Sequence, residues 1–479
     1  MSQEWLTLLW AMPALGGLAA AFSGRLGRWI ALLVSASTLA YSLGLFVPLG
    51  SGSWSAPLPG AAWAFGIRYS LACDGLSLSL CWLTAFLTVA CVIASWPRNF
   101  SAGYWAAFLF LEAALLGVFL ARDLFLFFVF WEAVLVPMFF IIGLWGLDNR
   151  RRAAMKFFLF TFFGSIFLLI GSIALVTVYH QRTGIWTWDM ARLKGPGGLS
   201  GLLIFSAMAL GFAVKIPLVP LHTWLPDAHT EAPAAGSVML AGVLLKMGVY
   251  GFLRVLWPVF PDMTWQLMPW LGAIAAVNVI YGALCAMAQT DLKRLIAYSS
   301  VAHLGFCLLG ALSRTPEGLL GAAVQMLNHG ITTGALFLLV GFIYDRAHRR
   351  GLSDFGELAR RAPWLTFFFG FSILASIGLP GLNGFVGEFM CLIGAARVLP
   401  ILAVAGVAGV TLSAAYALPA YQAVFWDEAK PGSASPLVHD LCGREKALLW
   451  VLCAVMLGIG LYPAPLLRVL EPCLLGLVP

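Results

Sequence analysis

Long apolar runs separated by short polar segments dominate the chain. Each run is long enough to cross the ~30 Å hydrocarbon core of a bilayer, and lipid favours helices because it offers no partners to free backbone groups. The connecting segments leave no room for a soluble domain, so we expect a single transmembrane domain of the all-α, polytopic class. The fourteen expected spans lie near residues 4–23, 29–48, 76–96, 104–121, 123–146, 156–179, 200–220, 232–256, 266–288, 295–312, 318–344, 363–395, 398–425 and 446–467.

Two of these runs contain helix-breaking residues. The seventh continues into VKIPLVPLHTWLPDAHTEAP (Val214–Pro233), and the twelfth contains SIGLPGLNGFVGEF (Ser376–Phe389). Proline interrupts a helix because it lacks a backbone donor. Broken spans at corresponding positions of two halves are typical of inverted repeats. We therefore expect two inverted five-helix repeats with broken helices 7 and 12. Their approximate bounds are 104–256 and 266–425, with peripheral helices over 4–96 and 446–467.

Composition and charge agree with a membrane protein. Hydrophobic residues make up 61% of the 479 residues and charged residues only 10%, against about 25% charged in soluble proteins. This excludes a soluble enzyme, a nucleic-acid-binding protein and a disordered chain. Alternate loops carry seventeen and nine of the 28 basic residues. The richer set is expected to be cytoplasmic, which puts both termini on the outer side.

Ionisable residues inside the expected spans are the candidates for function, because a charge near the bilayer centre costs at least about 2.5–3.5 kcal/mol. Glu132 lies in span 5 and either exchanges protons or is a neutral structural glutamate. Lys215 precedes a helix break, whose free carbonyls can hold an ammonium group. Lys246 has no acid within one turn of its helix, so any partner comes from another helix. These lysines suit proton loading and release, whereas a static ion pair or snorkelling is the structural alternative.

Further candidates lie in the other spans. Glu388 follows the break in span 12, and Glu112 lies in span 4. Either can relay protons or be a neutral carboxyl bonded to a neighbouring helix. Histidine titrates near neutral pH and suits a relay, and the histidines at or near membrane depth are His222, His229, His303 and His329.

Other chemistry lacks support in the sequence. The nine cysteines contain no C-x-x-C pair and lie mostly in apolar runs, which indicates small buried residues. Too few closely spaced histidines are present for haem or copper, and no phosphate-binding loop or dinucleotide fingerprint occurs. We therefore expect no bound cofactor, no metal site and no redox site in this chain.

Six segments around these residues resemble the antiporter-like subunits of respiratory complex I. They are VFWEAVLVPMF at Glu132, FAVKIPLVPLHTWLPDAHTEAP at Lys215, LLKMGVYG at Lys246, TDLKRLIAYSSVAHLG at His303, MLNHGITTGALF at His329, and GLPGLNGFVGEF at Glu388. The length leaves no room for the long lateral helix of the related L chain. The related L and N chains usually carry lysine where Glu388 lies, so this chain resembles a different branch of the family.

The resemblance implies a subunit of a proton-translocating NADH:quinone oxidoreductase in the bacterial inner membrane. It implies that Glu132 pairs with Lys215, that Lys246 is the central relay lysine, and that Glu388 ends the axis near the outer exit. His303 and His329 would join that axis, and Glu112 matches a span-4 carboxylate of the family. Neighbouring L and N chains would be partners, with FMN, iron–sulfur clusters and quinone in other subunits and the peripheral redox arm contacted only indirectly.

Other functions remain compatible with the residues. The same helices can serve a Na⁺/H⁺ antiporter, or a membrane-bound hydrogenase or ferredoxin-linked complex. A pure scaffold is disfavoured, because five buried ionisable side chains are costly in a membrane. No substrate-sized polar cluster indicates a solute transporter.

Overall fold

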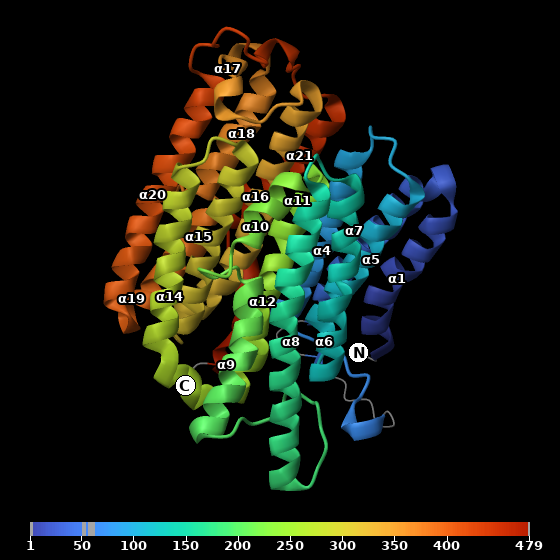
Figure 1. Cartoon of the computed structure of the whole chain (residues 1–479), viewed down its shortest axis with the longest axis vertical. Coiled ribbons are helices and arrows are strands. Elements are labelled where there is room, and N and C mark those ends of the chain that lie inside the picture. The colour runs from blue at the N-terminus through green and yellow to red at the C-terminus, as the bar shows by residue number, and fades with distance from the viewer. Residues whose placement is uncertain (1–2, 50–53, 56–62, 478–479) are drawn as a thin grey trace.

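The computed structural model of this chain describes residues 3–49, 54–55 and 63–477. Its helices stand side by side in one bundle, and both ends of the chain lie at the same end of that bundle (Figure 1). The helices in chain order are α1 (Gln3–Phe22), α2 (Gly27–Gly44), α3 (Phe46–Leu49), α4 (Gly75–Ser95), α5 (Ala102–Leu120), α6 (Leu124–Ala133), α7 (Leu135–Trp145), α8 (Arg150–Thr183), α9 (Gly198–Lys215), α10 (Trp224–Glu231), α11 (Ala234–Met239), α12 (Leu245–Gly251), α13 (Trp257–Val259), α14 (Pro261–Met287), α15 (Leu292–Leu312), α16 (Pro316–Ala347), α17 (Leu358–Arg361), α18 (Pro363–Ser376), α19 (Asn383–Val398), α20 (Pro400–Phe425), α21 (Gly443–Leu461) and α22 (Ala464–Leu474).

The helices confirm the membrane architecture expected from the apolar runs. Among the described residues, twelve helical segments are long and apolar enough to cross a membrane. The pair formed by α21 and the following helical segment, bent by 70°, makes a thirteenth. The remaining expected span, 363–395, is divided into α18 and α19, which are 14 and 16 residues long.

Both expected helix breaks are present. α9 ends at Lys215, and helix resumes only at Trp224 in α10. α18 ends at Ser376 and α19 begins at Asn383, with Gly378 and Gly381 between them in left-handed conformations at φ of 77° and 93°. A side chain disfavours these φ values, so glycine suits this turn. The inverted relation of the two five-helix units stays a prediction.

Aspartates fix the starts of several spans. Asp74, Asp123 and Asp291 precede α4, α6 and α15, and each carboxylate accepts hydrogen bonds from backbone N–H groups of the first turn. Such capping satisfies donors that have no partner within the helix. The polar residue directly before an apolar run therefore determines where each of these helices begins.

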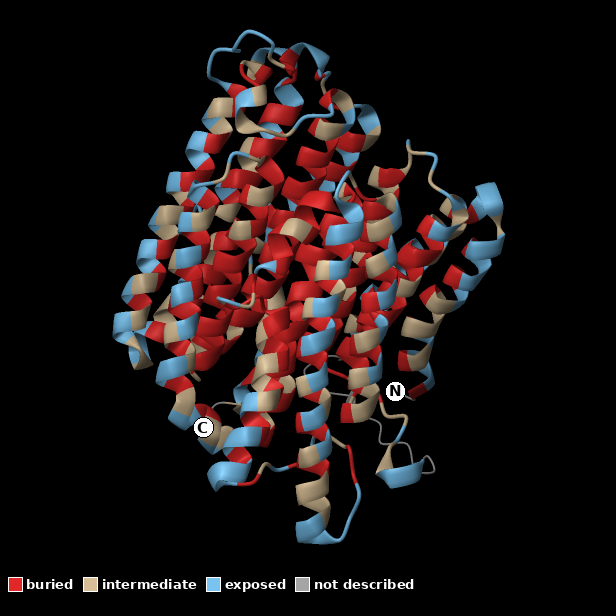
Figure 2. Ribbon diagram, viewed as in Figure 1, coloured by how far each residue is buried: buried red, intermediate tan, exposed pale blue. Residues whose placement is uncertain are grey.

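Burial separates the central helices from the peripheral ones. α15 and α16 are buried along nearly their whole length, whereas exposed positions lie along the outer helices (Figure 2). The exposed side chains of those outer helices are largely apolar, as on the faces of α8 and α20. An apolar outer surface suits contact with lipid rather than water.

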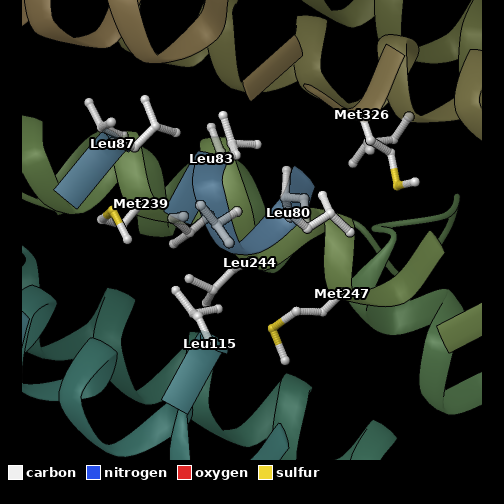
Figure 3. Packing of buried hydrophobic residues seen from close by; sticks show 14 of the residues in the cluster. Leu80, Leu83, Leu87, Leu115, Met239, Leu244, Met247 and Met326 are labelled. Atoms are coloured by element: carbon white, nitrogen blue, oxygen red, sulfur yellow. The ribbon is translucent and has the colours of Figure 1, made fainter. Parts of the chain in front are cut away.

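A layer of apolar side chains packs against the helix of the first half that carries Lys246. Leu80, Leu83 and Leu87 of α4 meet Met239, Leu244 and Met247 around α11 and α12, with Leu115 of α5 and Met326 of α16 close by (Figure 3). These residues pack against the helix that carries Lys246.

Three local features differ from the expectation. A short antiparallel pair, β1 (Trp54–Ser55) with β2 (Ala72–Cys73), lies between the second and third expected spans, where residues 50–53 and 56–62 are outside the described ranges. The last expected span ends at Leu461, and the chain then bends into α22. Of the nine cysteines, Cys442 is exposed and Cys285 and Cys473 are half-buried, so not all of them are core residues.

Candidate functional site

Lys246 lies in the middle of an irregular helix and is fully buried. α12 is only seven residues long and is bounded by two π-helical turns, 240–244 and 252–256. Such π turns leave backbone groups shifted out of register and occur frequently at functional sites. The Lys246 ammonium donates to the carbonyl of Ala241, in the first of these turns. Nothing in the amino-acid pattern indicated these turns.

A chain of titratable side chains leads from Lys246 into the second half. Lys246 Nζ lies 2.7 Å from Nδ1 of His329, on α16. The rings of His329 and His303 are 5.4 Å apart, centroid to centroid. Nδ1 of His303, on α15, lies 2.8 Å from Oε1 of Glu388, on α19. Four of the expected residues are therefore brought together by four different helices.

Glu388 lies at the far end of this chain, beside the break between α18 and α19. Its Oε1 also accepts a 3.0 Å hydrogen bond from Gln325 Nε2. Ser376, the last residue of α18, places its hydroxyl 3.3 Å from Nε2 of His303. A cavity of about 10 Å³ lies between His303, His329 and Ser376, which is roughly the room that one water needs.

Lys215 and Glu132 form a separate group at the other end of the site. Lys215 lies at the break that ends α9, whereas Glu132 lies near the end of α6, which continues into α7 as one span. The Lys215 ammonium is buried, lies 5.2 Å over the ring of Trp131, and has no hydrogen-bond partner among the described residues.

The expected pairing of Glu132 with Lys215 stays a prediction. Among the described residues no salt bridge within 4 Å joins them, and Oε1 of Glu132 is unpartnered. The ring of Trp131 lies under the ammonium instead, and its indole N–H donates to Ser165 of α8 at 3.1 Å.

Asn278 is a site residue that the sequence analysis missed. This fully buried side chain of α14 accepts a 2.7 Å hydrogen bond from the backbone of Val219 and donates to the carbonyls of Pro217 and Val301. It therefore replaces the backbone partners that the break after Lys215 removes. A polar amide inside an apolar run was the available signal.

We expect Asn278→Ala to destabilise the protein by about 2–3 kcal/mol, since three hydrogen bonds are lost and one buried donor is left unpaired. Thermal unfolding of the purified protein measures this. Lys215 lies at the edge of this break. Loosening the break should misplace Lys215, so we expect proton movement to fall together with the melting temperature. An unchanged melting temperature would contradict the role of Asn278 in holding the break.

The remaining expected residues lie outside this chain of contacts. Glu112 is fully buried on α5, and neither carboxylate oxygen has a hydrogen-bond partner among the described residues. His229 is buried against Phe337, with ring centroids 4.6 Å apart. The ring centroids of His222 and Tyr281 are 5.2 Å apart, near the break after α9.

The geometry can carry protons. Lysine, histidine and glutamate all bind and release a proton, and adjacent groups within hydrogen-bond distance exchange it without a free charge in the lipid. The 5.4 Å separation of the two histidine rings requires either a bridging water or a ring movement.

Comparisons with known proteins agree with this arrangement. Residues 121–413 match the family described as NADH:quinone oxidoreductase/Mrp antiporter, transmembrane. The chain is 42% identical to NADH-quinone oxidoreductase subunit M of Rhodobacter capsulatus, covering 95% of this chain and 91% of that protein. It is 40% identical to subunit M of Escherichia coli K12, covering 98% and 96%.

Solved structures show the same fold. A chain of respiratory complex I from Thermus thermophilus with bound NADH superposes with a TM-score of 0.88 at 33% identity, covering 99% of this chain and all of that one. A chain of the Mrp complex from Dietzia also reaches 0.88, at 24% identity, which shows the fold alone. The chain therefore belongs to the subunit M family of NADH-quinone oxidoreductase, among the NADH:quinone oxidoreductase/Mrp antiporter membrane proteins.

Proposed function

We propose that this chain moves protons across the bacterial inner membrane through Glu132, Lys215, Lys246, His329, His303 and Glu388. It does so as a subunit of an NADH-quinone oxidoreductase, whose redox chemistry takes place in other subunits. The observation that carries the proposal is the run of contacts from Lys246 to Glu388, with 2.7 Å and 2.8 Å at its two ends. Membership in the subunit M family supplies the redox context.

In this mechanism, a change of charge beside the chain alters how strongly Glu132 stabilises the Lys215 ammonium. When that stabilisation falls, Lys215 gives up its proton toward Lys246. The proton then passes to His329 and His303 and leaves from Glu388. Moving one charge against 100 mV requires about 2.3 kcal/mol, and loss of a buried counter-ion is worth about 3–5 kcal/mol. The charge change is therefore large enough to drive the step.

The proposed setting follows the relatives. FMN, iron–sulfur clusters and quinone belong to partner subunits, and the adjacent membrane partners are the antiporter-like chains L and N. Both termini face the outer side, because the loops richer in Lys and Arg face the cytoplasm. Glu112 has no assigned step, since no polar contact joins it to the relay among the described residues.

The test is purification of the chain in mild detergent, with mass spectrometry of the proteins that accompany it. We expect flavin and iron–sulfur subunits and an assembly that oxidises NADH. A small all-membrane assembly without redox subunits would replace the proposal with a cation antiporter. Co-purifying hydrogenase subunits would replace it with a hydrogenase-linked complex.

A further inference from the structure

A wide apolar groove lies on the outside of the bundle, and its lining includes Phe130 and Ala133, close to Glu132 in α6. α1, α5 and α7 lie next to one another there (Figure 1). The groove has a volume of about 550 Å³. Its floor is the glycine and alanine face of α5 between Gly103 and Ala114, and one wall is formed by Val136, Phe140 and Leu144 of α7.

The dimensions of the groove suit one leaflet of a membrane. From Gly103 to Ala114, α5 rises about 16 Å at 1.5 Å per residue, which is half of the ~30 Å hydrocarbon core. The groove runs from the start of α5 toward mid-membrane and is lined almost entirely by carbon. Trp145 lies at its end, the position that tryptophan prefers at a membrane–water interface.

A basic cleft continues the groove beyond Trp145. It begins at the next residue, Gly146, and its lining includes Arg150, Arg151 and Arg152. Arg150 donates to the carbonyl of Gly146. The other two arginines are exposed and make no hydrogen bond or ion pair with any described residue.

The cleft carries a net positive charge. Its only acid among the described residues is Asp148, against three arginines. An apolar groove that ends in unpaired guanidinium groups is complementary to a molecule with a hydrocarbon chain and an anionic head.

We propose that this groove and cleft bind an anionic phospholipid of the leaflet at the arginine-rich end of the bundle. One acyl chain lies along α5 against α7, and the phosphate is held by Arg151 and Arg152. A transmembrane helix of another subunit fits less well, because its apolar side chains offer no anionic group to the guanidinium groups of the cleft. The proposal does not depend on the proton relay.

Two variants test the two halves of the site in the intact complex. Val136→Trp fills the groove, and its matched control is Val407→Trp on α20, because these valines are 54% and 56% exposed. Arg151→Gln with Arg152→Gln removes the phosphate contacts, and Arg360→Gln with Arg361→Gln is its control at another exposed arginine pair. The measurement is phosphatidylglycerol retained per complex after detergent washing, by native mass spectrometry.

We expect both test variants to lose a retained phosphatidylglycerol that the wild type and both controls keep. The arginine variant should bind it roughly 30-fold more weakly. Equal retention in all variants would overturn the proposal. Equal retention of phosphatidylcholine and phosphatidylglycerol by the wild type would overturn the anionic headgroup. Loss of a neighbouring subunit from Val136→Trp, with lipid unchanged, would assign the groove to a protein. If Val136→Trp lowers the melting temperature, the result for Arg151→Gln with Arg152→Gln decides whether the proposal stands.

Discussion

Replacing Lys246 with methionine is expected to abolish the contribution of this chain to proton pumping while NADH oxidation continues. Lys246 is the only group in contact with both the π-turn carbonyl of Ala241 and His329 among the described residues. Methionine keeps the length of the side chain and cannot hold a proton. Loss of an acid–base group slows proton transfer by about 100-fold or more. Protons moved per NADH oxidised, in vesicles containing the whole complex, measure the effect.

Lys293 provides a matched control for this experiment. It is equally buried, but it lies in the first turn of α15 and its ammonium donates to the Ala232 carbonyl at 2.7 Å. No contact joins it to the relay among the described residues, so Lys293→Met should keep the proton ratio. If Lys246→Met leaves the ratio unchanged as well, Lys246 is not a relay group. If both variants move fewer protons per NADH, the loss comes from removing any buried lysine and not from the position of Lys246.

The sequence predicted the parts of this molecule that depend on local pattern. Apolar runs located the spans, and prolines located both breaks. Each effect depends on one segment alone, because lipid requires a helix to satisfy its own backbone groups and proline removes a backbone donor from its own helix. The residue types of the relay were also visible, since ionisable groups are rare at this depth.

Contacts between distant helices were not predictable. His303 and Glu388 are 85 residues apart, and nothing local fixes which of several neighbouring groups they meet. The Glu132–Lys215 pairing was expected from resemblance and stays a prediction, since the Lys215 ammonium lies over the ring of Trp131 and has no hydrogen-bond partner among the described residues. The break after Lys215 is a second example. The carbonyl of Pro217 in that break accepts a hydrogen bond from Asn278, which lies 61 residues away on another helix.

Glu388→Gln is expected to stop proton movement at the far end of the relay, with Glu112→Gln as the opposite case. Both glutamates are buried, and glutamine preserves their size while it removes the proton-binding carboxylate. Glu388 accepts from Gln325 and contacts His303, whereas neither oxygen of Glu112 has a partner among the described residues. A proton that reaches His303 in Glu388→Gln has no acceptor, so pumping through this chain should fall by about 100-fold or more.

Comparing Glu388→Gln with Glu112→Gln distinguishes the loss of a relay group from the loss of any buried carboxyl group. Glu112→Gln should leave the protons moved per NADH unchanged. The amide has nearly the size of the carboxyl group, and no polar contact joins Glu112 to the relay among the described residues. If both variants stop pumping, Glu112 belongs to the path and a movement of α5 must connect it to the other groups. If neither does, His303 passes its proton by another route, and Ser376, 3.3 Å from the second ring nitrogen of His303, is the next position to change. Only selective loss in Glu388→Gln supports an exit beside the break between α18 and α19.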